Sequence, residues 1–509
     1  MSKTYKRFAA AVMAGLLLAA CAAPAAAPQP AEAPKPAEEA QPAEAQPAEL
    51  APVTISYTYP GTVYKDVGLV EEALNAILQE RINATLKLNV IDWGAFDEKM
   101  KLANAAGEEC DLVFVAPWIN NFIQNVGNGN LVPLDDLLVQ YAPGLWKSMP
   151  LTSWDAARVG GKIYGVPNQQ IWVKPFGFTV RQDLADKYNL DVESITRYEE
   201  LEPFLEAVKQ GEPGVTPLQS AYNWMFETAG FDPIVSQETP VAVRFDDAEM
   251  KVFNSAATPE FKAAVELARK WYLAGYAPKD KIESADMQAM WRAGQFAMGL
   301  AGVVKPGGDI ESEQRFGQKV YQRSVTQPFL TTAGSTATMN AICRTSKNPE
   351  RAMMVLELLN TDVEIYNLLA KGIEGKHWEW ADKENKVIKP GPNSADYSPN
   401  TDWEFGNQFL AYYIDPEQAK QNVWEATYKL NNDSPPSVAL GFNFNPDPVK
   451  TELANVSAVY KELAEPLTLG MIDPATALPE LLARLDEAGI QRIIDETQRQ
   501  LNEWAAARK

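Results

Sequence analysis

Between residues 53 and 115, apolar side chains alternate between the spacing of strands and the spacing of helices. Val53–Tyr59 is rich in β-branched and aromatic residues and stops at a Pro-Gly turn, which predicts a strand. Apolar stripes predict helices over Asp66–Ile82 and Phe96–Ala106, and apolar runs predict strands over Leu86–Ile91 and Leu112–Val115. Strands that alternate with helices predict an α/β lobe with a parallel sheet covered on both faces.

Three aromatic residues follow these predicted strands. Tyr59, Trp93 and Trp118 each come at or just after the carboxyl end of a strand. Because ligands of open α/β sheets bind at that edge, the three side chains are candidates for ligand contact. Packing in the core or in a lid is the alternative interpretation of each.

Helical spacing dominates the rest of the chain. The expected helices are Tyr198–Gln210, Pro259–Ala274, Ala285–Ala293, Pro349–Leu359, Thr361–Ala370, Leu478–Ala488 and Ile490–Ala506. A loop is expected over Asn385–Asp402 because Lys389-Pro390-Gly391-Pro392 interrupts any regular pattern.

The first residues form a secretory leader, predicted to cover residues 1–20. Lys3, Lys6 and Arg7 precede the apolar run Phe8–Ala20, which is shorter than the roughly 20 residues that span a bilayer. Leu18-Ala19-Ala20-Cys21 at the cleavage point resembles a bacterial lipoprotein signal. That resemblance implies that Cys21 becomes the lipidated first residue of the mature chain and anchors it to the membrane.

Residues 21–52 are predicted to be a disordered tether. Ala, Pro, Glu and Gln make up nearly all of this segment, so it has too little apolar bulk to offset the entropy of ordering. Its prolines favour extended polyproline II geometry.

The net charge of the chain limits which kinds of molecule it is expected to bind. It is −21, and loss of the three basic residues of the leader takes it to −24. Nucleic acid is therefore not an expected partner, because phosphate binding needs clustered Lys and Arg. Membrane contact is expected through the lipid anchor only. The length after residue 52 predicts two lobes.

Residues for chemistry are sparse. The chain has one histidine, no nucleophile elbow, no phosphate loop, no dinucleotide fingerprint and no Asp-rich calcium loop. No catalytic residue, metal site or cofactor is therefore predicted. Besides Cys21, the cysteines are Cys110 and Cys343, which could pair or lie buried as thiols; buried thiols are the expectation, because each borders an apolar strand-like run.

The order of several short motifs resembles family 1 extracellular solute-binding proteins of ABC importers, in the LipO-type branch linked to complex-carbohydrate uptake. The motifs are Leu131–Leu138, Val159–Pro167, Arg181–Leu184, Lys187-Tyr188, Trp291–Met298, Thr345–Met353 and Gly372–Trp378. The similarity spans Val53 to Lys509 and includes a C-terminal region of unknown function.

The resemblance implies a type II periplasmic-binding-protein-like fold: two α/β lobes joined by a hinge, with the ligand cleft between them. The first lobe is expected to comprise residues 53–170 and 333–375, and the second residues 176–330 and 380–509. By the same similarity the chain should cross between lobes at 168–178, at 329–339, and again after about Trp380.

Residues at the expected crossings are candidates for sugar contact, since sugar binding requires aromatic faces and planar hydrogen-bonding groups. Trp118 and Trp172 are expected to form opposite walls of the cleft. Trp403, Phe405, Phe442 and Phe444 form a further aromatic set beside Asn443, for which core packing is expected. The crossing candidates are Asn168, Gln169, Gln170, Trp172, Asn223, Trp224, Glu374, His377, Trp378 and Trp380.

The predicted function is that of an extracytoplasmic lipoprotein, a monomer, that binds an oligosaccharide or glycoside by hinge closure and delivers it to an ABC permease. A polysaccharide-degrading enzyme and a peptide-binding receptor are the alternatives. A neutral sugar is expected unless Lys174 or Arg181 lines the cleft.

Overall fold

The computed structural model describes residues 50–222, 226–282, 284–301 and 303–508. The leader, Cys21 and nearly all of the predicted tether lie outside this set, as do Asn223 and Trp224. A compact body begins at Leu50. In the part of the chain that is described, no helix has the length and apolar character needed to cross a membrane.

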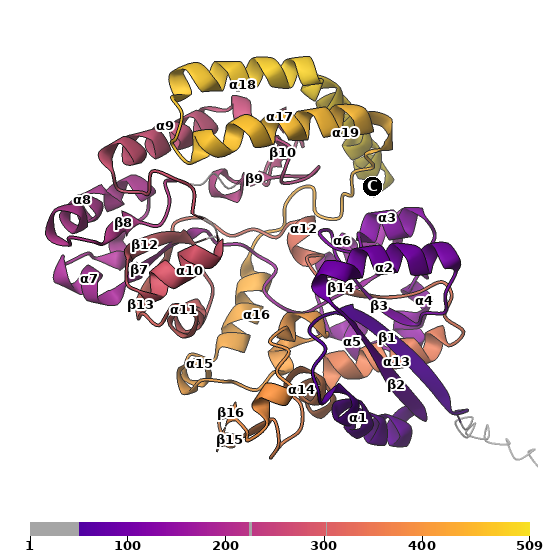
Figure 1. Ribbon diagram of the computed structural model, residues 1–509. Helices are drawn as coiled ribbons and strands as arrows, with labels where there is room; N and C mark the ends of the chain where they lie inside the picture. Colours follow the sequence, from indigo (N-terminus) through magenta and orange to yellow (C-terminus); the bar gives the residue numbers. More distant parts are fainter. Residues whose placement is uncertain (1–49, 223–225, 283, 302, 509) are drawn as a thin grey trace, which may run out of the picture. The chain divides into compact units, whose positions relative to one another are not determined.

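A five-stranded mixed sheet lies at the centre of the first lobe (Figure 1). The predicted parallel arrangement is confirmed for its first three strands, whereas the remaining two are antiparallel to their neighbours in the order β2-β1-β3-β14-β6. The strands are β1 (Val53–Pro60), β2 (Ala84–Ile91), β3 (Leu112–Val115), β14 (Met339–Ile342) and β6 (Val166–Pro167).

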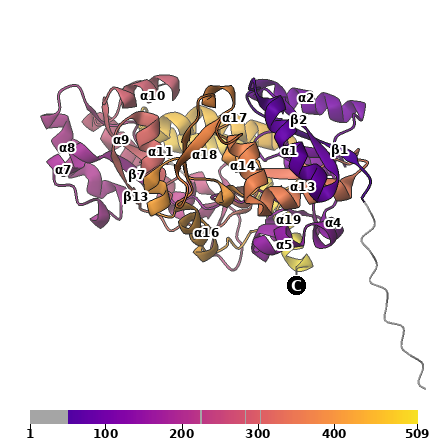
Figure 2. The ribbon, with the colours of Figure 1, turned by 90° about the horizontal axis from the view of Figure 1, so that it is seen from below.

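Helices cover both faces of this sheet. α1 (Val67–Ile82), α13 (Pro349–Thr361) and α14 (Val363–Lys371) pack together on one face, and α2 (Trp93–Ala106) lies on the other (Figures 1 and 2). The periodicity therefore predicted α1 and α2 to within a few residues, because each buries one apolar stripe, for example Val70, Leu74 and Leu78 of α1.

Smaller elements complete the first lobe. The segment expected to be a loop over Asn385–Asp402 contains a strand, β16, that pairs with β15; the expectation was wrong because Val387 and Ile388 are buried in this hairpin. The remaining elements are α3 (Phe122–Gly127), α4 (Asp135–Tyr141), α5 (Pro143–Ser148), α6 (Leu151–Ala156), β4 (Arg158–Val159), β5 (Lys162–Ile163), α12 (Thr332–Ser335), β15 (Trp378–Asp382), β16 (Val387–Pro390), α15 (Pro416–Lys420) and α16 (Val423–Asp433).

A separate hydrophobic cluster forms the second lobe around two small sheets, ordered β13-β7-β12-β8 and β11-β10-β9. The C-terminal helices α17 and α18 pack on α9 (Figure 1). The elements are β7 (Gly177–Arg181), α7 (Gln182–Lys187), α8 (Glu202–Gly211), β8 (Thr216–Leu218), β9 (Phe231–Asp232), β10 (Val241–Arg244), β11 (Phe253–Asn254), α9 (Pro259–Ala274), α10 (Ser284–Arg292), β12 (Phe296–Ala301), α11 (Gly308–Phe316), β13 (Val320–Ser324), α17 (Lys450–Thr468), α18 (Pro474–Ala488) and α19 (Ile490–Ala507).

The chain passes between the two clusters at residues 173–177, 325–330 and 433–442. The third crossing was expected after about Trp380, and that expectation is wrong. Tyr397, Phe405 and Ala411 belong to the first cluster, and Leu430 packs against it. Residues 380–432 therefore extend the first lobe, and only the segment after α16 leads to the second.

The three crossing segments are hydrogen-bonded to one another. The Val325 amide donates to the Phe176 carbonyl (2.9 Å), and the Leu330 amide donates to the Pro435 carbonyl (2.9 Å). Ser437 completes the contact by donating its amide to the Leu330 carbonyl (2.8 Å). Backbone pairing of this kind makes the crossings a single narrow connection, as a hinge requires.

Cys110 and Cys343 form a disulfide, which corrects the expectation of buried thiols. Cys110 lies two residues before β3 and Cys343 directly follows β14, and these strands are antiparallel neighbours with Leu112 opposite Ile342. This pairing brings the two Cα atoms to 5.6 Å, a normal separation for a disulfide. The residues are 233 positions apart, so spacing alone could not reveal the contact.

Candidate functional site

Three tryptophans meet at the carboxyl end of the first lobe's sheet, above the buried ring of Phe114. The ring centroids of Trp93 and Trp118 are 6.1 Å apart, with planes inclined by 21°. The Trp403 centroid lies 6.0 Å from that of Trp93 and 6.2 Å from that of Trp118. Phe114 supports the group edge-on, 6.1 Å from Trp118 and 6.3 Å from Trp403. We call Trp93, Trp118 and Trp403 the tryptophan platform.

Trp118 gives the platform its accessible surface. Its side chain is 54% exposed, although a tryptophan is usually buried for most of its area. The indole is nevertheless fixed, because its Nε1 donates to the Ala337 carbonyl (2.8 Å). A large apolar ring that is both exposed and held in place is typical of a binding surface.

The turns after β2 and β3 place two of these rings. The Asp92 carboxylate accepts from the Gly94 amide (2.9 Å) and caps α2, so the helix begins at Trp93 directly after the strand. After β3, Asn120 adopts a left-handed backbone (φ 43°) and donates its side-chain amide to the Phe114 carbonyl (2.8 Å). That bond closes the turn that carries Trp118.

Trp403 is held through its backbone, by a buried amide network. Asn168 Nδ2 donates to the carbonyls of Trp403 (3.1 Å) and Glu404 (2.9 Å). Asn340 Nδ2 donates to the Glu404 carbonyl (3.0 Å) and to Asn168 Oδ1 (2.8 Å), and Tyr57 donates its hydroxyl to Asn340 Oδ1 (2.7 Å). Low solvent exposure strengthens such bonds and makes them costly to lose.

Trp403 is a site residue that the sequence does not predict. Core packing is expected for both Trp403 and Phe405, and this is right for Phe405, which is fully buried. Asp402–Glu404 is a single 3-10 turn, so no periodicity separates the half-buried Trp403 from its core neighbours. The position of Trp403 is set by hydrogen bonds from Asn168 and Thr338 to its carbonyl. Both residues are distant in the sequence, so the residues around Trp403 do not indicate these contacts.

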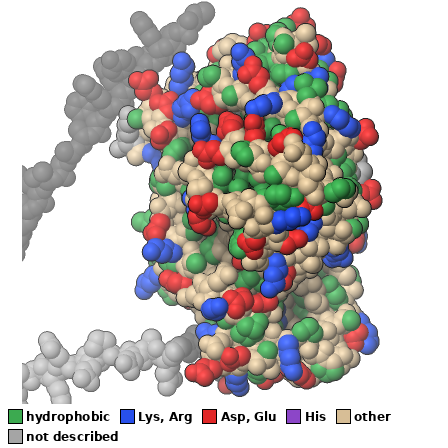
Figure 3. Space-filling view, turned by 90° about the vertical axis from the view of Figure 1, so that its left-hand side faces the viewer, with side chains coloured by type: hydrophobic (Ala, Val, Ile, Leu, Met, Phe, Trp, Pro, Cys, Tyr) green, Lys and Arg blue, Asp and Glu red, His purple; other side chains and the backbone are tan. Residues whose placement is uncertain are grey.

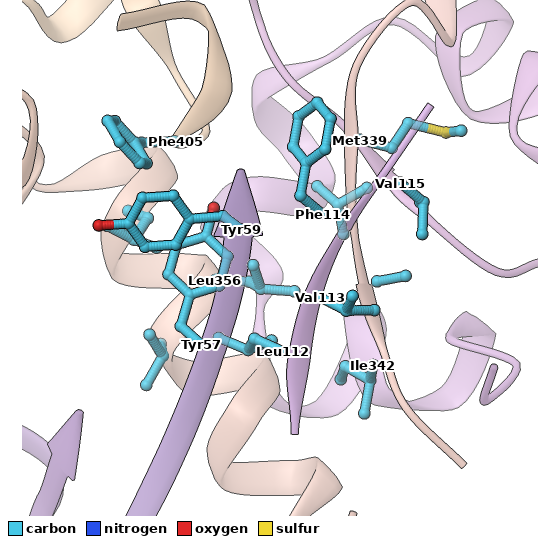
Figure 4. Close-up of a cluster of buried hydrophobic side chains, with 14 of the residues drawn as sticks. Tyr57, Tyr59, Leu112, Val113, Phe114, Val115, Met339, Ile342, Leu356 and Phe405 are labelled. Carbon is cyan, nitrogen blue, oxygen red and sulfur yellow. The ribbon is translucent and has the colours of Figure 1, made fainter. Parts of the chain in front are cut away.

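Tyr59, the third aromatic residue predicted for the rim, belongs to the core. Its side chain is 4% exposed and meets Phe405 edge-on at 5.2 Å (Figure 4). Burial raises the pKa of Tyr59 and of Tyr57 well above the ordinary value. Both side chains belong to the hydrophobic core of the first lobe.

Asn168 and Gln169 are structural residues of the first lobe. Asn168 is fully buried and uses its side chain on the network around Trp403. Gln169 is 2% exposed, and its Nε2 donates to Ser148 Oγ (2.8 Å). A ligand has no access to either side chain, so the predicted sugar contacts of these two residues are not supported.

Trp172 does not form a wall opposite Trp118. The side chain is 5% exposed and belongs to the first cluster, with Nε1 donating to the Asn168 carbonyl (2.9 Å). Its amide donates to Asn431 Oδ1 (2.9 Å), and Asn431 Nδ2 donates to the Gln170 carbonyl (2.6 Å). The prediction failed because an aromatic residue next to a crossing can be buried to hold the crossing in place, and need not face the cleft.

Four further candidates, Glu374, His377, Trp378 and Trp380, lie in or next to the β15–β16 hairpin. His377 is 2% exposed; its Nδ1 accepts from the Ile373 amide (2.9 Å), and its Nε2 lies 3.2 Å from Asp66 Oδ2. Trp378 is buried and meets Trp380 edge-on, with the ring centroids 4.9 Å apart. Glu374 is exposed. None of these four side chains has a contact with a platform residue among those described.

Two acidic residues, Asp402 and Glu404, lie on either side of Trp403 in the sequence. Glu404 is fully buried, and this burial raises the pKa of its carboxyl well above the ordinary value. Asp402 forms an ion pair with Lys371. Within the described ranges no group of three or more His, Cys, Asp or Glu side chains could hold a metal ion. Glu404 is thus enclosed in the protein interior, and the Asp402 carboxylate is paired with a cation.

Comparison with known proteins places the chain in a family. The model of the bacterial extracellular solute-binding proteins matches residues 72–361, and a domain of unknown function (DUF3502) matches residues 438–506. The chain is 30% identical over 446 residues to a carbohydrate ABC transporter substrate-binding protein of Streptococcus pneumoniae serotype 4, covering 86% of this chain and 87% of that one. The protein therefore belongs to the bacterial extracellular solute-binding proteins.

Solved structures support the same fold. The crystal structure of the N-glycan transport solute binding protein NgtS from Streptococcus pneumoniae is 26% identical, with a TM-score of 0.79 over 90% of this chain and 100% of that one. Structures of NgtS in complex with Man1GlcNAc and Man5GlcNAc, also 26% identical, cover 89% and 90% of this chain and 99% of theirs, with TM-scores of 0.68 and 0.67. The two-lobed α/β fold predicted from the sequence is confirmed, and the family is extracytoplasmic.

Proposed function

We propose that this protein captures a neutral oligosaccharide or glycoside on the tryptophan platform and delivers it to an ABC permease. The carrying observation is Trp118, an indole that is 54% exposed yet fixed through Nε1. Flat apolar faces stack on the C–H faces of sugar rings, while the surrounding polar groups bond hydroxyls. The relatives named for carbohydrate and N-glycan transport support this choice of ligand.

Hinge closure is the proposed capture step. A ligand that touches both lobes binds the closed state better and so shifts the population towards it. The paired backbone of the three crossings supports a narrow pivot.

The charges favour an uncharged ligand. Arg181, one of the two cations considered for an acidic sugar, forms an ion pair with Asp183 and donates to the Gly294 carbonyl. On the face drawn in Figure 3, acidic and basic side chains are interspersed. With a net charge of −21, the protein is not a match for nucleic acid, and we propose that it works as a monomer.

Binding without turnover is the expected result when the purified protein is titrated with Man1GlcNAc, Man5GlcNAc, xylan and pectic oligosaccharides, and an unrelated peptide. Calorimetry should give a micromolar Kd, about 8 kcal/mol, for at least one glycan. Ligand at 100 times Kd should stabilise the fold by about 2.7 kcal/mol in thermal unfolding. Chromatography of the recovered sugar checks that it is intact. Cleaved sugar would favour the enzyme alternative, and stabilisation by the peptide alone would favour the receptor alternative.

The lipid anchor is a second part of the proposal, and rests on Leu18-Ala19-Ala20-Cys21. Acyl chains supply about 0.8 kcal/mol per buried methylene, so the body needs no membrane-binding surface. Cys21→Ser should move the protein from the membrane fraction to the soluble fraction of the envelope. Persistence of the variant in washed membranes would contradict the anchor.

A further inference from the structure

The segment that returns from the second lobe holds two of the three platform tryptophans. The Ala337 carbonyl accepts from Trp118 Nε1 (2.8 Å). The next residue, Thr338, donates its hydroxyl to the Trp403 carbonyl (3.2 Å). Trp118 and Trp403 lie 285 positions apart in the sequence, and adjacent residues of one segment fix their relative placement.

The Thr338 hydroxyl is the point where this segment contacts the residues that lead into the first crossing. Besides its donation to Trp403, Oγ1 accepts from Gln170 Nε2 (2.7 Å) and from Asn168 Nδ2 (3.3 Å). A hydroxyl has one donor and two acceptor positions, so all three are used. Thr338 is 4% exposed, and water therefore does not compete for these bonds.

The same segment leads directly to the hinge. Leu330 is bonded to Pro435 and Ser437 of the third crossing, and Thr331 then caps α12 through its hydroxyl, which accepts from the Gly334 amide (2.9 Å). Gly334 lies so close to the first crossing that a Cβ there would stand 2.1 Å from the Trp172 carbonyl oxygen. Only glycine fits this contact, so the path from the hinge to Thr338 is tightly packed.

We infer that Thr338 is a positioning residue for ligand binding: its hydroxyl sets Trp403 against Trp118 and joins the platform to the segment that leads into the first crossing. The inference rests on the proposed function, since it assigns the hydroxyl a role in the affinity of the same site. Thr338 does not touch the ligand. It acts through Trp403, and its loss alters the platform's shape while the outer faces of the rings remain.

The test compares Thr338→Val, which removes the hydroxyl at nearly constant shape, with Thr338→Ser, which keeps it. Thr497→Val is the matched control, because Thr497 is also buried and donates one bond, to the Ile493 carbonyl of α19 (2.7 Å). Glycan affinity is measured by calorimetry well below the unfolding midpoint. Thr338→Val should weaken binding at least tenfold, Thr338→Ser by less than about threefold, and Thr497→Val not at all.

Circular dichroism supplies a readout that needs no ligand. Indoles about 6 Å apart couple their excitations, so the ligand-free protein should show paired bands of opposite sign in the far ultraviolet. Thr338→Val should change these bands, and Thr338→Ser should restore them. Unchanged bands and unchanged affinity in Thr338→Val would overturn the inference, as would equal losses in the valine and serine variants.

The two readouts separate this inference from the proposed function. If the unaltered protein binds no glycan, the proposed function fails, and the coupled bands still test whether Thr338 sets the rings. If the protein binds glycan and Thr338→Val binds equally well with altered bands, the role of Thr338 in affinity is wrong while the proposed function stands.

Discussion

Replacement of Trp118 by alanine is expected to weaken glycan binding by about 2 kcal/mol or more, roughly thirtyfold, because central tryptophans dominate binding energies. The variant removes the exposed ring of the platform and leaves Trp403 in contact with Phe114 beneath it. Calorimetric titration with the best glycan of the panel measures the effect. The fold should be little affected, since the lost side chain is 54% exposed.

Two variants sharpen this experiment. Trp118→Phe keeps an aromatic face and loses the bond to the Ala337 carbonyl, so it should lie between the alanine variant and the unaltered protein. Tyr428→Ala removes another exposed aromatic ring, 39% exposed on α16, and should leave the affinity unchanged. Equal affinities for Trp118→Ala and Tyr428→Ala would show that the ligand does not use the platform.

Loss of the disulfide is expected to destabilise the protein by about 2–5 kcal/mol, as removal of native disulfides commonly does. The bond joins Cys110 and Cys343, 233 positions apart, and so restricts the unfolded chain strongly. The double variant Cys110→Ser, Cys343→Ser should unfold at a lower denaturant concentration than the unaltered protein. Circular dichroism and tryptophan fluorescence follow the transition.

Reduction provides the control for the disulfide. The unaltered protein in excess reductant should unfold at the same midpoint as the double serine variant, and reductant should leave the variant unchanged. If all four curves coincide, the two cysteines are unpaired thiols in the folded protein, as the sequence analysis expected. A protein with two lobes can unfold in more than one step. The midpoint of the first unfolding transition is therefore the quantity to compare among the four curves.

Local patterns predicted the elements of the first lobe well, because a buried strand or an amphipathic helix has a characteristic spacing over a few consecutive residues. They also brought Trp93 and Trp118 together, since parallel neighbouring strands end at one edge of a sheet. The pairing of β14 with β3 could not be predicted from such local patterns, because these antiparallel strands are more than 200 positions apart in the sequence.

The candidate site was only partly predictable for the same reason. Asn168 and Trp172 look like exposed crossing residues in the sequence, and contacts with Trp403 and Asn431 turn them inward. His377 is likewise buried beside Asp66, a residue more than 300 positions earlier. Polar residues near a hinge can serve the ligand or the hinge, and only the fold distinguishes the two uses.

The bond between Trp118 and Ala337 has a consequence for selectivity. An indole has a single N–H group, and here it is already engaged, so Trp118 offers a guest carbon surface alone. Epimers that share the same hydrophobic underside should therefore rest on this ring equally well. Discrimination between one monosaccharide unit and another must then come from the polar groups that bond the rim of the pyranose.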